Sequence, residues 1–471
     1  MGQQLMSRGG FLLRGHPPGL ALLFLTEMWE RFSFYGMRAL LVLYMTEQLL
    51  LPENAHRVAG YPALKSSLES VFGPLSTQAM SSQIYGMYSS LLFFTPFFGG
   101  LLADRFLGQY RSVLIGATLM ALGHFLMASD TFFLLALLLI IVGNGCFKPN
   151  ISSQVGNLYP PGDSRRDRAF SIFYVGINLG GFIAPVVCGT LGEVYGWHYG
   201  FFAAGVGMVI GFVIFVLGRK YLPADVRPRD AAAAGAPIKQ PLRASDMKAI
   251  GALCLVAFVI TFFWASYEQT GNAVVLWVRD FTDRSVFGLF DIRITWFQSM
   301  NPLLVFLLTP VLVALWSWQA MRRREADVVT KLAIGCFLAS FAYAVLVLSA
   351  VLAGADGRVS WSWLVLFFVL ITFAELHVSP VALSFFSRMA PAPVASMMMG
   401  VWYMSGVVGN YLTGVMGSFW EQLPKAAFWM LVSVVPLGAG LVVLALRRPL
   451  NRIIHEQDEI KRQELLAQQA V

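Results

Sequence analysis

A stripe of ionisable side chains inside an apolar segment near the start of the chain has the residue types needed for ion chemistry. The segment runs from about residue 19 to 50, and residues 27, 30, 31 and 38 within it are charged. Because successive helical residues are rotated by about 100°, Glu27, Arg31, Tyr35 and Arg38 share one face, with Glu30 at its edge. Charges in hydrocarbon are unfavourable unless they are paired or hydrated. The stripe therefore predicts a pathway for a proton and a zwitterionic solute, or alternatively a structural cluster of ion pairs that joins helices.

Further ionisable residues lie inside later apolar segments. Lys148 belongs to the fourth segment, Glu268 to the seventh and Glu375 to the tenth. The first half of the chain thus places positive groups within the membrane (with Arg31 and Arg38), and the second half places negative groups there. A ligand with a carboxylate at one end and an ammonium at the other could bridge them. The alternative is that these residues form ion pairs that act only as gates, and the two interpretations are compatible.

Amide and aromatic side chains accompany the charges. Asn178 and Asn301 are the stronger candidates, because a buried amide needs hydrogen-bond partners. A single aromatic residue in a membrane helix more often contributes to packing or to the interfacial belt. The aromatic candidates are Tyr35, Tyr85, Tyr88, Tyr174 and Trp402.

The composition indicates a polytopic membrane protein. Of the 471 residues, 57% are hydrophobic and 13% are charged, and the mean hydropathy is +0.65. The net charge of +8 does not indicate nucleic-acid binding, because the basic residues lie in short loops between apolar runs. The histidines show no metal-ligand spacing, so we expect no metal site and no cofactor other than the proton as coupling ion.

Twelve apolar segments are long enough to span a bilayer. Only closed helices satisfy the backbone in lipid, so the sequence predicts an all-α fold. The segments are residues 19–50, 79–107, 111–128, 131–156, 167–191, 197–221, 247–278, 293–318, 328–354, 360–386, 394–419 and 425–447.

The distribution of basic residues predicts the orientation. With both termini in the cytoplasm, the cytoplasmic segments hold 24 of the 34 Lys and Arg residues, against 7 in the opposite loops. The longest cytoplasmic connection, residues 223–246, is rich in Ala, Pro, Arg and Asp and is typical of a flexible linker. It separates a six-helix bundle at 1–222 from a second bundle and cytoplasmic tail at 247–471. Such a division suggests pseudo-symmetric bundles with a substrate site at mid-membrane.

The loop after the second segment resembles a known signature. Residues 99–111 read GGLLADRFLGQYR, and they resemble the G-x-x-x-D-R loop of the major facilitator superfamily. The resemblance implies the major facilitator fold, with Asp104, Arg105 and Arg111 joining helix ends at the cytoplasmic face.

Two further motifs indicate a family within that superfamily. Residues 27–36 read EMWERFSFYG and resemble the E-x-x-E-R-F-x-Y-Y-G motif of the proton-dependent oligopeptide transporter (POT) family. Residues 170–180 read FSIFYVGINLG and resemble its second signature, F-x-x-x-Y-x-x-I-N-x-G. The strings around Lys148, Glu268, Asn301 and Glu375 are similar to family positions too, so the resemblance runs from the first helix to the eleventh.

The resemblance implies a proton-coupled symporter that imports di- and tripeptides by alternating access. By analogy with the family, the proton-coupling residues are Glu27, Glu30, Arg31, Lys148 and Glu268. The peptide-binding residues are Tyr35, Arg38, Tyr88, Lys148, Asn178, Asn301, Glu375 and Trp402. We expect a monomer in the bacterial cytoplasmic (inner) membrane, whose partners are peptides, protons and the lipid bilayer.

The chain departs from the family pattern in two respects. Phe34 replaces the first Tyr of the motif, which removes a hydroxyl from the predicted pocket. The 223–246 linker has no room for the two extra helices of many bacterial members, and the short loop before residue 360 excludes the large extracellular domain of animal members. These features favour a bacterial-type protein with twelve membrane helices.

Two alternative functions remain at this stage. A family member could carry a different small solute or anion such as nitrate, although the E-x-x-E-R motif and Glu375 favour an ammonium-bearing substrate with proton coupling. An intramembrane enzyme or a receptor is the other alternative. We expect no enzyme, because no His-Glu-x-x-His, Gly-x-Ser-x-Gly or paired-Asp metal motif lies within a membrane segment.

Overall fold

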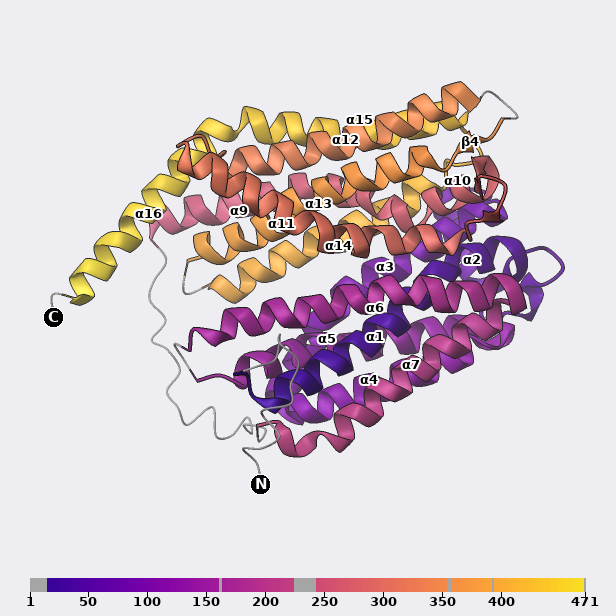
Figure 1. Ribbon diagram of the computed structural model, residues 1–471, viewed down its shortest axis with the longest axis horizontal. Coiled ribbons are helices and arrows are strands. Elements are labelled where there is room, and N and C mark those ends of the chain that lie inside the picture. Colours follow the sequence, from indigo (N-terminus) through magenta and orange to yellow (C-terminus); the bar gives the residue numbers. More distant parts are fainter. Residues whose placement is uncertain (1–14, 161–162, 224–242, 354–356, 392–393, 470–471) are drawn as a thin grey trace. The chain divides into compact units, whose positions relative to one another are not determined.

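The computed structural model describes residues 15–160, 163–223, 243–353, 357–391 and 394–469. Every predicted membrane segment is helical within these ranges, so the all-α prediction is confirmed. The long helices are α1 (Pro18–Tyr44), α3 (Thr77–Leu102), α4 (Gln109–Leu126), α5 (Phe133–Asn157), α6 (Arg165–Tyr195), α7 (Trp197–Leu217), α9 (Ala244–Tyr267), α11 (Met300–Met321), α12 (Val328–Ala353), α13 (Ser362–Met389), α14 (Ala395–Gly417) and α15 (Lys425–Ala445). Figure 1 shows them as long rods labelled along the chain.

Several elements were absent from the sequence prediction. Helices α2 (Tyr61–Phe72) and α16 (Arg447–Gln469) lie outside the predicted membrane segments, whereas α10 (Ala273–Phe281) is a separate helix at the end of the predicted segment 247–278. The described residues also contain four two-residue strands, which form two pairs. Strand β1 (Thr282–Asp283) runs parallel to β4 (Val359–Ser360), and β2 (Ser285–Val286) runs antiparallel to β3 (Phe290–Asp291).

Hydropathy alone identifies most of the membrane helices. Among the described residues, nine helical stretches are long and apolar enough to cross a bilayer. The stretches that fall short include α1, whose four charged residues exceed what an ordinary span tolerates. The charged stripe is therefore what prevents α1 from qualifying as an ordinary span, and charged residues inside a membrane helix usually indicate function.

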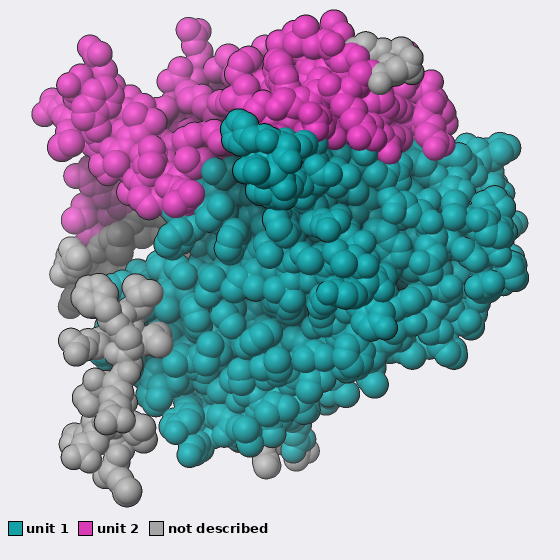
Figure 2. Space-filling model, turned by 45° about the vertical axis from the view of Figure 1, so that its right-hand side comes forward, with its two compact units in different colours: residues 1–236, 271–279, 284–306 teal, residues 237–270, 280–283, 307–471 magenta. Residues whose placement is uncertain are grey.

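The chain forms two compact units, coloured separately in Figure 2. Unit 1 comprises residues 1–236, 271–279 and 284–306, and unit 2 comprises residues 237–270, 280–283 and 307–471. Of the predicted linker 223–246, residues 224–242 lie outside the described part of the chain. The domain boundaries at 222 and 247 therefore stay a prediction.

Small residues bring α1 against α6 in unit 1. A Cβ on Gly180 would lie 2.2 Å from the carbonyl oxygen of Met28, and one on Gly36 would lie 2.6 Å from Sγ of Cys188. Lipid supplies no hydrophobic force between helices, so such close backbone packing is what holds membrane helices together. The α1–α6 contact fixes the rotation of α1, and it includes part of the stripe, because a Cβ on Gly180 would lie 3.0 Å from Cβ of Arg31.

Helix α5 is held in the same way on two sides. A Cβ on Gly99 of α3 would lie 1.9 Å from the carbonyl oxygen of Gly145, and one on Gly116 of α4 would lie 2.5 Å from that of Gly143. Asn144 adds a side-chain hydrogen bond of 3.0 Å to the carbonyl oxygen of Leu92 on α3. These contacts fix the position of Lys148, one turn further along α5.

Unit 1 also includes chain from beyond residue 270. The Glu193 carboxylate accepts hydrogen bonds from the backbone N–H of Thr295 (2.8 Å) and of Ile294 (3.2 Å), and from Oγ1 of Thr295 (2.6 Å). A Cβ on Gly271 would lie 2.2 Å from the hydroxyl of Tyr85. The residues just before α11 and the residue Gly271 thus pack within unit 1.

Candidate functional site

Glu27, Glu30 and Arg31 form a compact ionic cluster on α1. All three side chains are buried, with exposed fractions of 3%, 1% and 5%. Arg31 donates from Nη2 to Oε1 of Glu30 at 2.7 Å, and its Nε lies 3.4 Å from Oε1 of Glu27. Glu30, placed by helical geometry at the edge of the stripe, is thus the closer partner of the guanidinium. Two carboxylates share one cation, and the cluster carries a net charge of −1 when both acids are ionised.

One oxygen of this cluster lacks a partner. Oε2 of Glu27 is buried, and no described residue donates a hydrogen bond to it. A buried carboxylate oxygen without a donor is unfavourable, and binding a proton relieves it by removing the charge. The cluster therefore has an acceptor position for one proton.

Phe34, where the family motif has Tyr, contacts the same cluster. The guanidinium carbon of Arg31 lies 4.9 Å from the centroid of the Phe34 ring, and the ring packs edge-to-face on Tyr35 with centroids 5.1 Å apart. A cation over an aromatic face is stabilised by the ring quadrupole, which does not require a hydroxyl. The ring contact with Arg31 therefore exists without the tyrosine hydroxyl.

Arg38 lies further along α1 and is half-buried. It donates to the hydroxyl of Tyr85 from Nε at 3.0 Å and from Nη2 at 2.8 Å. The neighbouring Tyr88 is 2% exposed, and no described residue forms a hydrogen bond with its hydroxyl. The charges of Arg38, Glu30 and Arg31 all act on that hydroxyl. Tyr88 thus presents an unsatisfied polar group next to the ionic residues of α1.

Lys148 lies on α5, near the same group of charges. Its ammonium is 5.2 Å from the centroid of the Phe93 ring on α3, and its charge acts on Glu27. Unit 1 therefore brings together the residues assigned to proton coupling on α1 and α5.

The two asparagines have different surroundings. Asn178 on α6 donates to the carbonyl oxygen of Tyr174, one turn earlier on its own helix, at 2.9 Å. This bond satisfies part of the amide and leaves its oxygen for another donor. Asn301 stands at the second position of α11, in the part of α11 that belongs to unit 1. Both predicted amide ligands thus lie in unit 1 with the stripe of α1.

Glu268 in unit 2 sits where the seventh membrane segment changes conformation. Helix α9 ends at Tyr267, a 3₁₀ turn covers Glu268–Gly271, and α10 begins at Ala273. Glu268 is 6% exposed. The adjacent Gln269 is anchored by a 2.9 Å hydrogen bond to the carbonyl oxygen of Thr413 on α14. The carboxylate of Glu268 therefore lies on a short irregular segment with a fixed neighbour.

Glu375 on α13 has a partner that the sequence analysis did not assign. The hydroxyl of Tyr267 donates to its Oε2 at 2.8 Å. Tyr267 also packs edge-to-face on Trp264, which in turn packs on Trp402 with ring centroids 6.3 Å apart. The signal available in the sequence was the position of Tyr267, directly before Glu268. Unit 2 thus places both intramembrane glutamates and Trp402 around the end of α9.

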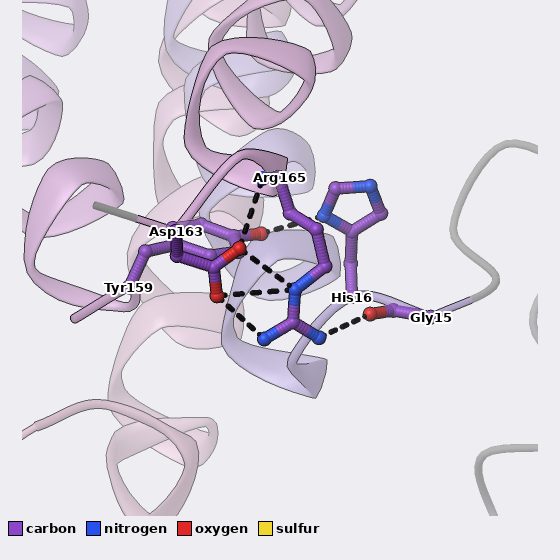
Figure 3. A network of polar contacts seen from close by, with 5 residues as sticks. All are labelled: Gly15, His16, Tyr159, Asp163 and Arg165. Atoms are coloured by element: carbon purple, nitrogen blue, oxygen red, sulfur yellow. Dashed lines mark hydrogen bonds and ion pairs between the residues drawn. The ribbon is translucent and has the colours of Figure 1, made fainter. Parts of the chain in front are cut away.

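A separate polar network lies outside the membrane segments of unit 1 (Figure 3). Arg165, at the start of α6, donates from Nη2 to Oδ2 of Asp163 at 2.6 Å and from Nη1 to the carbonyl oxygen of Gly15 at 2.8 Å. Nδ1 of His16 is 2.7 Å from the hydroxyl of Tyr159. The network attaches the residues before α1 to the loop between α5 and α6.

The charges of this network influence its titrating groups. Hydrogen bonds from Arg165 lower the pKa of Asp163 to about 2, because they favour the carboxylate. Burial lowers the pKa of His16, and the positive charges of Arg168 and Arg165 lower it further. The neutral form of His16 is therefore the one that the network favours.

The chain resembles proteins of one family over nearly its whole length. The model of the POT family matches residues 110–236 and 238–430. The peptide transporter YePEPT of Yersinia enterocolitica is 33% identical, with 95% of this chain and 97% of that protein aligned. A di-/tripeptide transporter of Lactococcus lactis subsp. cremoris is 31% identical, with 93% and 97% aligned. A crystal structure of a mutant peptide transporter POT in complex with alafosfalin has a TM-score of 0.80 and 31% identity, with 96% of this chain and 99% of that chain covered.

Proposed function

The chain belongs to the POT family of transporters, and we propose that it is a proton-coupled symporter that imports di- and tripeptides by alternating access. The observation that carries the proposal is the buried cluster of Glu27, Glu30 and Arg31, in which one carboxylate oxygen has no donor among the described residues. Such a cluster can take up one proton within the membrane.

Proton uptake changes the electrostatics of the cluster in a defined way. With both carboxylates ionised, the cluster has a net charge of −1 and attracts the ammonium of Lys148. Protonation of Glu27 leaves Glu30 and Arg31 as a balanced pair, and the attraction for Lys148 falls. The proton therefore controls how strongly Lys148 is held, and a released Lys148 can bind a peptide carboxylate.

The chemistry of peptide recognition is divided between different parts of the chain. Arg38 and Lys148 supply positive charge for the carboxylate, and Glu375 supplies negative charge for the amino group. Tyr35, Tyr88, Asn178, Asn301 and Trp402 contribute polar and aromatic surface. The similar proteins of Yersinia and Lactococcus are described as peptide and di-/tripeptide transporters, which supports peptides over nitrate as the substrate.

We further propose that the protein acts as a monomer in the bacterial inner membrane with both termini in the cytoplasm. The excess of basic residues in the segments on that side supports this orientation.

Uptake of labelled dialanine into proteoliposomes tests the proposal. We expect accumulation that requires an inward acid gradient and a negative-inside potential, that collapses with a protonophore, and that other dipeptides inhibit but nitrate does not. Uptake that is insensitive to the gradient would exclude symport with protons. No uptake in vesicles that contain folded protein would exclude dialanine as a cargo.

Two carboxylate variants test the coupling residues. Glu30→Gln and Glu268→Gln should abolish accumulation driven by the proton gradient, whereas peptide exchange at equal pH should persist. The matched control is Glu459→Gln, which neutralises an exposed glutamate on α16. If both membrane variants accumulate peptide like the control, neither residue couples transport to the proton.

A further inference from the structure

A concave, basic corner lies where the last membrane helix meets the C-terminal helix. It is an open hollow of about 720 Å³, and its lining comprises Leu444, Ala445, Arg447, Arg448, Asn451, Arg452 and His455. Leu444 and Ala445 end α15, and the polar residues belong to the first three turns of α16. Figure 1 shows α16 leaving the end of α15 in a new direction. Apolar side chains thus meet three arginines within one pocket.

The charges of α16 are sorted between its faces. On the face towards the rest of unit 2, Leu450 and Gln457 are each 3% exposed, and Gln457 donates to the carbonyl oxygen of Ser245 at 2.8 Å. The acids near this face are engaged, because Glu456 pairs with Lys248 at 3.0 Å and Asp458 pairs with Arg388. These two acidic side chains therefore hold α16 against the rest of unit 2, and each is paired with a base outside the corner.

Most of the positive charge of the corner is uncompensated. Arg447 pairs with Asp327 at 2.7 Å. Within the part of the chain that the structure describes, neither Arg448 nor Arg452 has an ion-pair partner. These two residues are four apart, so they project from the same face of the helix, and His455 follows on that face. Two arginines thus lie on one face of α16 without an ion-pair partner among the described residues.

The surroundings indicate an amphiphilic occupant. Above the corner, α15 exposes apolar side chains, with Leu441 54%, Val442 44% and Leu444 43% exposed. In a membrane helix such surface faces acyl chains. A free anion would leave this apolar surface unused, whereas a phospholipid would place its phosphate on the arginines and its chains along α15. Basic pockets at the ends of membrane helices bind anionic head groups for this reason.

We propose that this corner, centred on Arg448 and Arg452, binds the headgroup of an anionic phospholipid in the leaflet that surrounds the end of α15. The bound lipid bridges α15 and α16 and holds α16 at the membrane surface. This site is distinct from the ionic clusters of the transport pathway, and it depends on neither the substrate nor proton coupling.

Thermal unfolding of the purified full-length protein in detergent tests the proposal. The protein is titrated with dioleoylphosphatidylglycerol, with dioleoylphosphatidylethanolamine and with inorganic phosphate at constant ionic strength. We expect the melting temperature to rise with phosphatidylglycerol at much lower concentrations than with the other two. An equal effect of phosphatidylethanolamine would exclude charge recognition, and an equal effect of phosphate would identify a site for free anions.

Two double variants of equal net charge locate the site. Arg448→Gln/Arg452→Gln should raise the phosphatidylglycerol concentration at half-effect about 25-fold, from about five-fold for each basic residue near an anionic lipid. The control, Arg324→Gln/Arg462→Gln, removes two exposed charges outside the corner and should change it little. Equal losses in both variants would overturn the proposal in favour of general charge attraction.

A conservative variant separates binding from folding. Arg448→Lys/Arg452→Lys keeps both charges, so it should retain most of the lipid effect, and its melting temperature without lipid shows whether the helix is intact. A loss as large as that of the Gln variant, at an unchanged melting temperature without lipid, would exclude charge-based headgroup recognition at these two positions.

Discussion

Two adjacent glycines on α3 provide a direct test of how α5 is positioned. A Cβ on Gly99 would lie 1.9 Å from the carbonyl oxygen of Gly145, whereas a Cβ on Gly100 would have its nearest neighbour, Cβ of Pro149, at 3.8 Å. Ordinary contact begins at 3.4 Å, so Gly99→Ala must separate α3 from α5 by about 1.5 Å, the difference between 3.4 and 1.9 Å. Gly100→Ala requires no movement.

The expected magnitudes follow from these distances. Overpacking of a close interface costs about 1–3 kcal/mol, because both partners are backbone atoms that cannot rotate away. This corresponds to a fall in melting temperature of about 2–6 °C for Gly99→Ala. Gly100→Ala should stay within about 1 kcal/mol of the wild type, or gain slightly from the higher helix propensity of alanine.

The same perturbation should reach the functional residues. The ammonium of Lys148 sits over the Phe93 ring of α3, so separating the two helices displaces Lys148 from its neighbours. We expect dialanine uptake to fall in Gly99→Ala and to be unchanged in Gly100→Ala. Thermal unfolding in detergent and uptake in proteoliposomes measure both effects. Equal melting temperatures for the two variants would refute the close approach of α3 and α5.

Three further predictions concern single side chains. Tyr88→Phe removes a buried hydroxyl without a described partner, so it should stabilise the protein by about 1–3 kcal/mol in thermal unfolding. The KM for dialanine should rise if that hydroxyl binds peptide. A lower melting temperature would show that the hydroxyl already has a hydrogen-bond partner. Glu193→Gln places an amide donor against the backbone N–H of Ile294 or Thr295, so it should destabilise the protein by about 1–3 kcal/mol in thermal unfolding. An unchanged melting temperature would contradict the contact. The pKa of His16, measured by NMR of labelled histidine, should lie below 6.5 and should rise towards 6.5 in Arg165→Gln. A lowered pKa means that the folded state with His16 in contact disfavours the proton, so this contact is present above about pH 6.5 and is lost as the pH falls. An unshifted pKa in the wild type would refute the network.

The membrane helices could be predicted from the sequence because the requirement that lipid imposes is local. A segment of about 20 apolar residues must be helical whatever its neighbours are, so each predicted segment coincides with a long helix over most of its length. Helix α16 does not follow from that rule. Its sequence is polar, and it is held by partners distant in the sequence, such as Lys248 for Glu456. Hydropathy carries no information on those contacts.

The candidate site likewise contains features that follow from local sequence and contacts that do not. The 100° rotation per residue was enough to place Glu27, Arg31 and Arg38 on one stripe of α1. It could not show that Arg31 prefers Glu30, because that choice depends on side-chain torsions in a buried environment. It also could not pair Tyr267 with Glu375, since they are 108 residues apart on different helices. The assignment of proton and peptide roles to these residues stays a prediction.

The contacts of Glu193 bear on the order in which the protein is assembled during synthesis. Glu193 leaves the ribosome 102 residues before Thr295, so its carboxylate must wait for its donors while α6 is already made. Tyr85 likewise meets the segment at Gly271 only after the seventh span has been inserted. A fragment that ends at residue 222 would therefore lack pieces of its own compact unit. Co-expressed halves, in contrast, carry every segment that unit 1 requires, and each half would act as the folding partner of the other.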